Sequence, residues 1–370
     1  MAKPSLEIEV NGMKFKNPFV LGSGPPGTNG RVIARAFERG WGGVVCKTIS
    51  MDNSKVHNVA PRYGKLRSRE TGEIIGFENI ELISDRPYDV WLKEFREVKE
   101  KHPEGMLIAS IMEEYNKERW QKMATEVQET GVDGFELNLS CPHGLPERRM
   151  GAAMGQSCEI TEEVVGWVKE VSSIPVWAKM TPNITDITMP AQSAVDGGAD
   201  GIAAINTILS IIGVNLDTLK PQPTVEGYTV PGGYSAQAVR PIALRHVMEL
   251  GRAFKDTDIT ISGIGGVETA ADAIQFILLG SSTVQICTGA MLRGFKMIDE
   301  LNADLEKWME EKGFDSINDF LGHSLQFFST HADLAARQLA AKRAKAGLAS
   351  RDDEWTGDGI QAETDALTAE

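Results

Sequence analysis

The sequence predicts an α/β protein built as a (β/α)8 TIM barrel, and three observations carry this prediction. Eight short apolar segments, rich in Val and Ile, recur along the chain. Amphipathic helical stretches separate most of them. The apolar segments are nearly continuous rather than alternating, which is typical of parallel strands covered by helices. Because eight strands close such a barrel, we expect a closed sheet, with a doubly wound open sheet as the alternative.

The predicted elements follow one another in a regular order. Asn11-Gly12, between two alternating segments, predicts an N-terminal β-hairpin. The eight barrel strands are expected at residues 18–24, 42–49, 106–112, 134–140, 174–180, 201–206, 258–265 and 282–289. Helices are expected at residues 117–131, 160–173, 189–198 and 269–280, and most of these end in Gly, as helix C-termini do.

Two insertions and a change in composition define the domains. The insertions, at about residues 50–100 and 207–240, follow the second and sixth predicted strands, on the side where a barrel builds its active site. Near the C-terminus, an Ala/Lys/Arg-rich helical stretch is followed by an acidic one. We therefore expect a barrel domain over residues 1–325 and a helical and acidic C-terminal extension over residues 326–370. The extension is either a solvated tail or a subunit contact.

The composition limits the classes of partner and the cellular compartments that we expect for this protein. The formal net charge of -14 argues against nucleic acid or an anionic membrane as a partner. The sequence contains no apolar run long enough for a transmembrane helix, and its start lacks the pattern of a secretory signal. We therefore expect a cytoplasmic protein.

The four cysteines do not form a recognisable framework. Cys46, Cys141, Cys158 and Cys287 show no C-x-x-C spacing, and no histidine completes a zinc pattern. A ferredoxin-like cysteine run is also absent, so we expect no metal site and no iron–sulfur cluster in this chain.

Glycine-rich segments follow the first and seventh predicted strands. GSGPPG, at residues 22–27, matches a dinucleotide pattern, but its two prolines lack the N–H groups that bind a pyrophosphate. We interpret it as a strand-end loop that contacts another ligand or forms a plain turn. Gly265 and Gly266 follow the seventh strand, and Thr288 and Gly289 end the eighth. In a barrel these two loops commonly bind phosphate, although ordinary helix capping is the alternative.

Two lysines end otherwise apolar strands. Lys47 and Lys179 would be costly to bury without a partner. At the ends of barrel strands they are typical of donors to an anionic or electron-rich ligand, such as a flavin. A single lysine at a strand end could extend its amine to solvent. Two such lysines favour the interpretation that they bind a ligand.

Amides and hydroxyls gather at the same strand ends. Asn138 and Ser140 end the fourth strand, Asn206 and Thr207 end the sixth, and Asn116 follows the third. A carboxamide both donates and accepts hydrogen bonds, which suits a flat heterocycle with alternating C=O and N–H groups. Each residue alone could serve in a turn.

Cys141 and His143 are the candidate catalytic residues. Both follow the fourth strand, in ELNLSCPHG. The thiol could act as acid, base or nucleophile, but a nucleophile needs a base and an orienting third group, and no Asp or Asn partner for His143 is evident. A loop that merely contains a thiol is the alternative.

Together these segments resemble the FMN-binding catalytic barrel of dihydropyrimidine dehydrogenases, within the dihydroorotate dehydrogenase-like superfamily. The resemblance covers roughly residues 5–325 and is carried by ELNLSCPHG, NIELIS, AKMTPNITDI and GGYSAQAVRPIALR. Dihydroorotate dehydrogenases are similar as far as Ser-Cys-Pro but typically continue with Asn. His143-Gly144 therefore favours the pyrimidine-reducing branch.

The resemblance implies a role for each candidate residue. FMN contacts would fall on Gly22, Ser23, Lys47, Thr48, Lys179, Asn206, Ser235, Gly265, Gly266, Thr288 and Gly289. Pyrimidine contacts would fall on Asn116, Asn138, Ser140, Asn206 and Thr207. Cys141 would be the catalytic acid, on a loop that closes over the substrate.

The resemblance also implies the reaction and its partners. A hydride would pass from FMN N5 to C6 of uracil or thymine, and Cys141 would deliver a proton to C5. Electrons would come from a separate FAD/NAD(P)H and iron–sulfur subunit, in a homo- or hetero-oligomer. The alternatives are the same chemistry on dihydroorotate or another heterocycle, and a barrel subunit with mainly a docking role.

Overall fold

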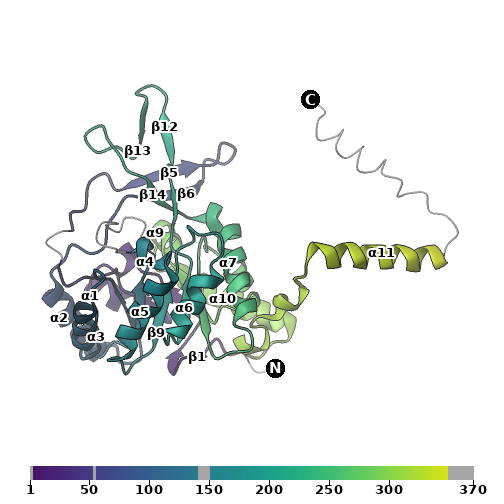
Figure 1. The fold of residues 1–370 in the computed structure, drawn as a ribbon, viewed down its shortest axis with the longest axis horizontal. Helices are drawn as coiled ribbons and strands as arrows, with labels where there is room; N and C mark the ends of the chain where they lie inside the picture. Colours follow the sequence, from purple (N-terminus) through teal and green to yellow (C-terminus); the bar gives the residue numbers. More distant parts are fainter. Residues whose placement is uncertain (1–2, 53–55, 141–150, 349–370) are drawn as a thin grey trace. The chain divides into compact units, whose positions relative to one another are not determined.

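In the computed structural model of the chain, described over residues 3–52, 56–140 and 151–348, eight parallel strands close into a barrel (Figure 1). They are β3 (Phe19–Leu21), β4 (Gly43–Val45), β7 (Met106–Ile111), β8 (Gly134–Asn138), β9 (Val176–Lys179), β10 (Gly201–Ala204), β15 (Thr260–Ile264) and β16 (Thr283–Ile286). Consecutive barrel strands are neighbours, and the pairing of β16 with β3 closes the ring. The predicted closed barrel is confirmed, and the open sheet is excluded.

Helices surround the barrel strands (Figure 1). They are α1 (Gly30–Arg39), α2 (Tyr88–Lys101), α3 (Lys117–Gln128), α4 (Ala152–Gly155), α5 (Cys158–Lys169), α6 (Thr188–Asp196), α7 (Arg240–Ala253), α8 (Ala270–Leu278), α9 (Thr288–Arg293) and α10 (Met297–Lys312). Short 3-10 turns occur at η1 (Pro25–Gly27), η4 (Gln237–Val239), η5 (Ile317–Asp319) and η6 (His323–Phe327). The large apolar core lies between strands and helices and includes the fully buried Trp41, Trp91 and Trp120.

Local sequence signals set the helix ends. The Asn29 side chain accepts from the backbone N–H of Val32 and so begins α1, and Gly40 ends it with a left-handed φ of 107°. At α8, Thr269 and Asp272 form a reciprocal capping box. These side chains satisfy backbone groups that the helix itself leaves unpaired.

The predicted N-terminal hairpin is confirmed. β1 (Ile8–Val10) pairs antiparallel with β2 (Met13–Phe15), and Asn11 and Gly12 both have positive φ, of 51° and 81°. The Asn11 side chain accepts from Trp177 Nε1 at 2.8 Å and donates to the Asp200 carbonyl at 2.9 Å. The hairpin is thereby attached where β9 and β10 begin, at the barrel end opposite the strand C-termini.

The two insertions join in one sheet, which the sequence did not predict. β5 (Tyr63–Arg67) and β6 (Ile74–Asn79) come from the first insertion, whereas β11 (Ile208–Ser210) and β14 (Gly232–Ser235) come from the second. They form an antiparallel sheet in the order β11-β14-β6-β5, in which β14 pairs with β6. We call this four-stranded sheet the roof, because residues of β5, β6 and β14 line the cavity described below.

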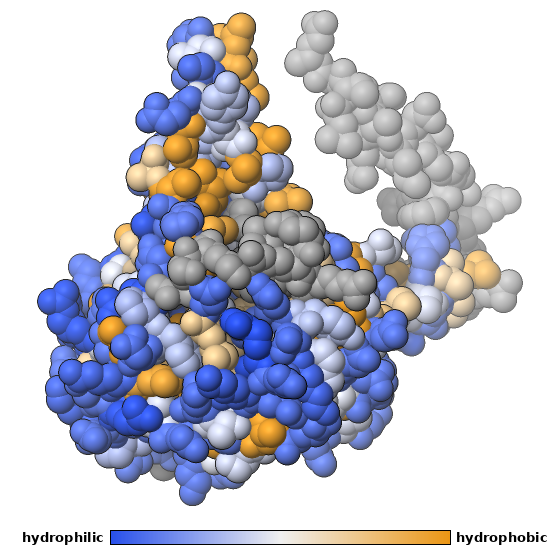
Figure 2. Space-filling view, turned by 60° about the vertical axis from the view of Figure 1, so that its left-hand side comes forward, coloured by the Kyte–Doolittle hydropathy of each residue, from blue (hydrophilic) through white to orange (hydrophobic). Residues whose placement is uncertain are grey.

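A small ribbon extends from the second insertion. It consists of β12 (Gly213–Asn215) and β13 (Lys220–Gln222), which pair with each other. Leu216 and Leu219 are 83% and 77% exposed. Figure 2 shows apolar surface gathered on the projecting part of the molecule that carries this ribbon.

The chain divides into two compact units, Met1–Leu325 and Gln326–Glu370. Within the second unit, α11 (His331–Leu348) is a single helix on which Leu334 and Leu339 are exposed. In the part of the chain that the structure describes, no helix is both long and apolar enough to cross a membrane.

A buried carboxylate links the two insertions. Glu78, on β6, is 1% exposed. It accepts hydrogen bonds from the backbone N–H groups of Ile212 and Gly232, at 2.9 and 3.2 Å, and from the Ser210 hydroxyl at 3.2 Å. One side chain of the first insertion therefore satisfies three donors of the second.

We predict that Glu78→Ala loosens the roof. Burying two backbone donors without an acceptor should lower the free energy of unfolding by about 2–3 kcal/mol. Chemical denaturation measures this loss, and limited proteolysis should cut residues 207–235 faster. Glu70→Ala, at an exposed position of the same insertion, is the control. Equal effects of the two substitutions would contradict the linking role.

Candidate active site

A cavity lies between the roof and the carboxyl ends of the barrel strands. It holds about 1130 Å³ of empty space, including the part open to solvent. From the predicted flavin set, the residues that line it are Ser23, Lys47, Thr48, Lys179, Asn206, Ser235, Gly265, Gly266, Thr288 and Gly289. From the predicted pyrimidine set, Asn138, Asn206 and Thr207 line it. The structure thus brings most of the predicted residues together.

The other predicted site residues in the described part of the chain are not among those that line the cavity. Gly22 lies next to the cavity wall, where an added Cβ would come within 2.8 Å of Ile264 Cδ1. Ser140 is fully buried and is not among the lining residues. Asn116 is exposed and accepts from the Arg119 N–H as the N-cap of α3, so the structure does not bring it to the other amides. Cys141 and His143 lie outside the described residues.

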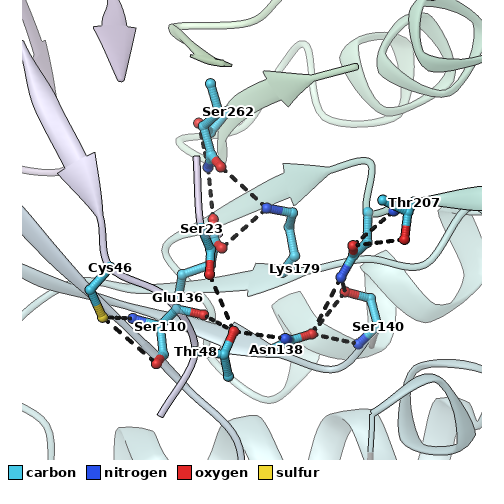
Figure 3. Close-up of polar contacts among 12 residues, drawn as sticks. Ser23, Cys46, Thr48, Ser110, Glu136, Asn138, Ser140, Lys179, Thr207 and Ser262 are labelled. Atoms are coloured by element: carbon cyan, nitrogen blue, oxygen red, sulfur yellow. Dashed lines mark hydrogen bonds and ion pairs between the residues drawn. The ribbon is translucent and has the colours of Figure 1, made fainter. Parts of the chain in front are cut away.

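The Lys179 ammonium sits in a closed ring of polar groups (Figure 3). Its Nζ donates to Glu136 Oε1 at 3.1 Å and to Gln285 Oε1 at 3.2 Å. Gln285 Nε2 in turn donates to Glu136 Oε2 at 2.7 Å. A buried lysine therefore has a carboxylate partner, as its low exposure requires.

Lys47 has a second carboxylate partner, which comes from the first insertion. Its Nζ lies 3.0 Å from Glu81 Oε2, and both side chains are below 10% exposed. Arg62 Nη1 and the Tyr63 hydroxyl also donate to Glu81, at 2.8 and 3.2 Å. Burial, followed by repulsion from Glu81, raises the pKa of Tyr63, so this hydroxyl stays a hydrogen-bond donor at neutral pH. Glu81 thus attaches the segment that follows β6 to the segment just after the barrel strand β4.

The amides and hydroxyls form a connected network (Figure 3). Asn138 Nδ2 donates to Thr48 Oγ1 at 2.9 Å, and Asn138 Oδ1 accepts from the backbone N–H of Ser140 at 3.2 Å. Asn206 Nδ2 donates to Ser140 Oγ at 2.8 Å, and Asn206 Oδ1 accepts from the backbone N–H of Thr207 at 2.8 Å. These bonds fix the orientation of both carboxamides, so the polar groups that face the cavity are arranged before any ligand binds.

The glycines after β15 line the cavity and, in the part of the chain that the structure describes, leave two backbone N–H groups without a backbone acceptor. Gly265 and Gly266 have positive φ, of 146° and 72°, and a Cβ on Gly266 would lie 2.7 Å from the Ala236 carbonyl oxygen. Neither amide donates to another backbone group within the described residues. Beside them, the hydroxyls of Ser235 and Thr288 lie 2.8 Å apart. The N–H groups of Gly265 and Gly266, beside two hydroxyls in one cavity lining, are a donor set that suits a phosphate.

Comparison with known proteins places this geometry in a family. A family model described as "Dihydroorotate dehydrogenase" matches residues 5–309. The chain belongs to the dihydroorotate dehydrogenase family. It is therefore a flavin-dependent oxidoreductase acting on CH–CH bonds. Within the described residues, no group of His, Cys, Asp and Glu side chains is arranged to hold a metal ion.

Relatives in this family carry two related names. The chain is 54% identical to "Dihydropyrimidine dehydrogenase (NADP(+)), chloroplastic" of Arabidopsis thaliana, over 100% of this chain and 89% of the relative. It is 42% identical to "NAD-dependent dihydropyrimidine dehydrogenase subunit PreA" of Escherichia coli K12, over 87% and 77%. It is 36% identical to "Dihydroorotate dehydrogenase B (NAD(+)), catalytic subunit" of Pyrococcus horikoshii, over 88% and 100%. The resemblance to the dihydropyrimidine dehydrogenases is thereby confirmed.

Several cavity residues of this family member were not predicted from the sequence. They are Asn79, Glu81, Glu136, Tyr234 and Gln285. Glu136 could have been found, because it lies two residues before Asn138 on one strand, and side chains two apart share a face. Asn79, Glu81 and Tyr234 belong to the insertions, where no strand was assigned.

Two of the described cysteines, Cys46 and Cys287, have thiols with raised pKa values. Cys46 is fully buried, and burial raises its pKa to about 12, as expected for a packing thiol. Cys287 lines the cavity, and burial raises its pKa to about 11, partly offset by Lys179 and Lys47. Both thiols are therefore neutral at pH 7.

We predict that Lys179 and Glu136 depend on each other for stability. Lys179→Met leaves a buried carboxylate without its cation and should lower the free energy of unfolding by about 3–5 kcal/mol. Lys179→Met combined with Glu136→Leu removes both charges and should regain most of this loss. Chemical denaturation of the two variants measures the difference.

Lys117→Met is the control for this pair. Lys117 and Glu170 form an exposed ion pair, which contributes little to stability. If the double variant were no more stable than Lys179→Met alone, the two buried charges would be independent.

Proposed function

We propose that this chain reduces uracil or thymine to the 5,6-dihydropyrimidine with bound FMN. The observation that carries the proposal is a hydrogen-bond network in which Asn138, Asn206 and Thr207 line one cavity and Ser140 connects the two asparagines, beside two paired lysines. Two relatives named as dihydropyrimidine dehydrogenases, 54% and 42% identical, support the same substrate class.

The hydrogen-bond donors that line the cavity suit the phosphate and the ring system of FMN. We propose that the amides of Gly265 and Gly266, with the hydroxyls of Ser235 and Thr288, hold the phosphate. The remaining proposed contacts are Gly22, Ser23, Lys47, Thr48, Lys179, Asn206 and Gly289. Lys179 would hold a positive charge against the electron-rich edge of the ring system. Bound FMN supplies the hydride that adds to C6 of the pyrimidine.

The carboxamides would orient the pyrimidine. Its ring alternates C=O and N–H groups, and a carboxamide such as that of Asn138 or Asn206 can both donate and accept hydrogen bonds. The network on the barrel side sets the direction of each amide, so the ring would bind in one orientation. Asn79 lines the same cavity from the roof, where its Nδ2 donates to the Gly233 carbonyl at 3.1 Å. We add it to the proposed substrate contacts and keep Asn116 as a sequence-based proposal.

Cys141 is the proposed proton donor to C5, with His143 beside it in sequence. Its neighbour Ser140 is fully buried and bonded to Asn138 and Asn206. The chain therefore enters the proposed catalytic segment directly from the amide network. Proton transfer needs the thiol within hydrogen-bond reach of the reacting carbon, and this connection supports that placement.

We propose that electrons come from a separate FAD/NAD(P)H and iron–sulfur subunit, in a homo- or hetero-oligomer. The names of two relatives include the word "subunit", which supports a partner.

We further propose a barrel domain at residues 1–325 and an extension at residues 326–370, supported by the two compact units. For location we propose the cytoplasm. Because the plant relative is named as chloroplastic, cell fractionation is the test.

The substrate is tested by reoxidation of the reduced protein. We predict that uracil and thymine reoxidise the chemically reduced flavoprotein rapidly and orotate does not, measured by stopped-flow absorbance. Reoxidation by orotate alone would overturn the pyrimidine assignment in favour of the second candidate. That candidate, dihydroorotate, is favoured by the 36% identical relative of Pyrococcus horikoshii. A protein with no bound flavin and no turnover would favour a docking role.

We predict that Cys141→Ala retains FMN and loses most of its turnover, by about 10²–10⁴-fold, because the proton donor is removed. Absorbance of the bound flavin and steady-state rates measure the two properties. Cys158→Ala, at the first turn of α5 and outside the cavity lining, is the matched control. Wild-type turnover in Cys141→Ala would show that another group donates the proton.

A further inference from the structure

We propose that Glu136 and Gln285 are positioning residues that hold the Lys179 ammonium in the cavity floor and set the reduction potential of the bound flavin. The inference rests on the proposed function, in which Lys179 faces the flavin. It assigns a role to two buried side chains that the proposed reaction does not use.

The first argument is the geometry of the ring. Lys179 Nζ donates to both partners, and the Gln285 amide also donates to Glu136, so each of the three side chains bonds the other two. An ammonium has three donors. Two are used within the ring, and Lys179 also lines the cavity, so the third is available to a ligand there.

The second argument is that the ring cannot rearrange easily. Lys179, Glu136 and Gln285 are 4%, 1% and 0% exposed. Glu136 and Lys179 lie on the paired strands β8 and β9, whereas Gln285 reaches them from β16, which pairs with neither. Gln285 Nε2 also donates to Ser262 Oγ at 3.1 Å. Two neighbouring strands and a third strand that pairs with neither therefore locate one ammonium group.

The third argument is the charge. Glu136 offsets the charge of Lys179, and the amide of Gln285 adds none, so the ring is neutral overall. Reduction adds negative charge to a flavin, and in a buried site a nearby unit charge acts over several ångströms with little screening. Removing the carboxylate should therefore favour the reduced flavin, and a second carboxylate should disfavour it.

The test uses sulfite, an anion that adds to oxidised flavin and is sensitive to nearby positive charge. Glu136→Gln should lower the sulfite dissociation constant by about tenfold, and Gln285→Glu should raise it by about tenfold, both at pH 8. Each tenfold change corresponds to about 30 mV in a two-electron potential. A redox-dye titration measures this shift independently.

The decisive variant exchanges the two groups. Glu136→Gln combined with Gln285→Glu keeps one carboxylate and one amide in the ring, so both the sulfite constant and the potential should return to the wild-type values. Thermal denaturation checks that each variant is folded. A purely structural role predicts lower stability in all three variants with an unchanged sulfite constant.

Glu113→Gln is the matched control. Glu113 is 1% exposed and paired with Arg119, but it does not line the cavity, so its loss should leave the sulfite constant unchanged. Flavin-loaded Glu136→Gln and Gln285→Glu single variants that both keep the wild-type potential would overturn this inference and leave the proposed function standing. A wild-type protein that binds no FMN would overturn both.

Discussion

Closure of the parallel barrel is the constraint on which the rest of the structure depends. Once β16 pairs with β3, the carboxyl ends of all eight strands meet at one rim. Polar residues that are far apart in the chain, such as Lys47 and Lys179, then line one cavity. The closed interior also excludes solvent, so charges near it need partners from other strands. Glu136 meets this need for Lys179 through direct contact.

The roof is the second structural feature that the candidate active site requires. The barrel rim alone would be an open surface, and the two insertions turn it into a cavity by joining β6 to β14. Glu78 holds the insertions together from within, and Glu81 attaches the first of them to Lys47. A ligand in this cavity therefore contacts barrel side chains on one side and roof side chains such as Tyr234 and Asn79 on the other.

Apart from Ser235, which only the resemblance supplied, the residues that sequence reasoning found share one property: they directly follow, or end, an apolar strand. Asn138, Asn206 and Lys179 could be predicted because strand ends of a parallel barrel converge whatever the intervening helices do. Asn116 met the same criterion, but its side chain caps α3, an equally common use of Asn after a strand. Asn79 was missed because its place in the cavity depends on pairing with β14, about 150 residues away in sequence. No local pattern reports such a contact.

The sequence by itself determined the closed barrel, the N-terminal hairpin and the strand-end residues, since strand periodicity, turn chemistry and capping act over a few neighbouring residues. The tertiary structure alone decided which side chains share a cavity, how the insertions cover it and which groups balance the buried charges. Gln285 illustrates the division: in sequence it is one polar residue in an apolar strand. Only the barrel interior places it 3.2 Å from Lys179, because distances between strands depend on the closure and register of the whole sheet.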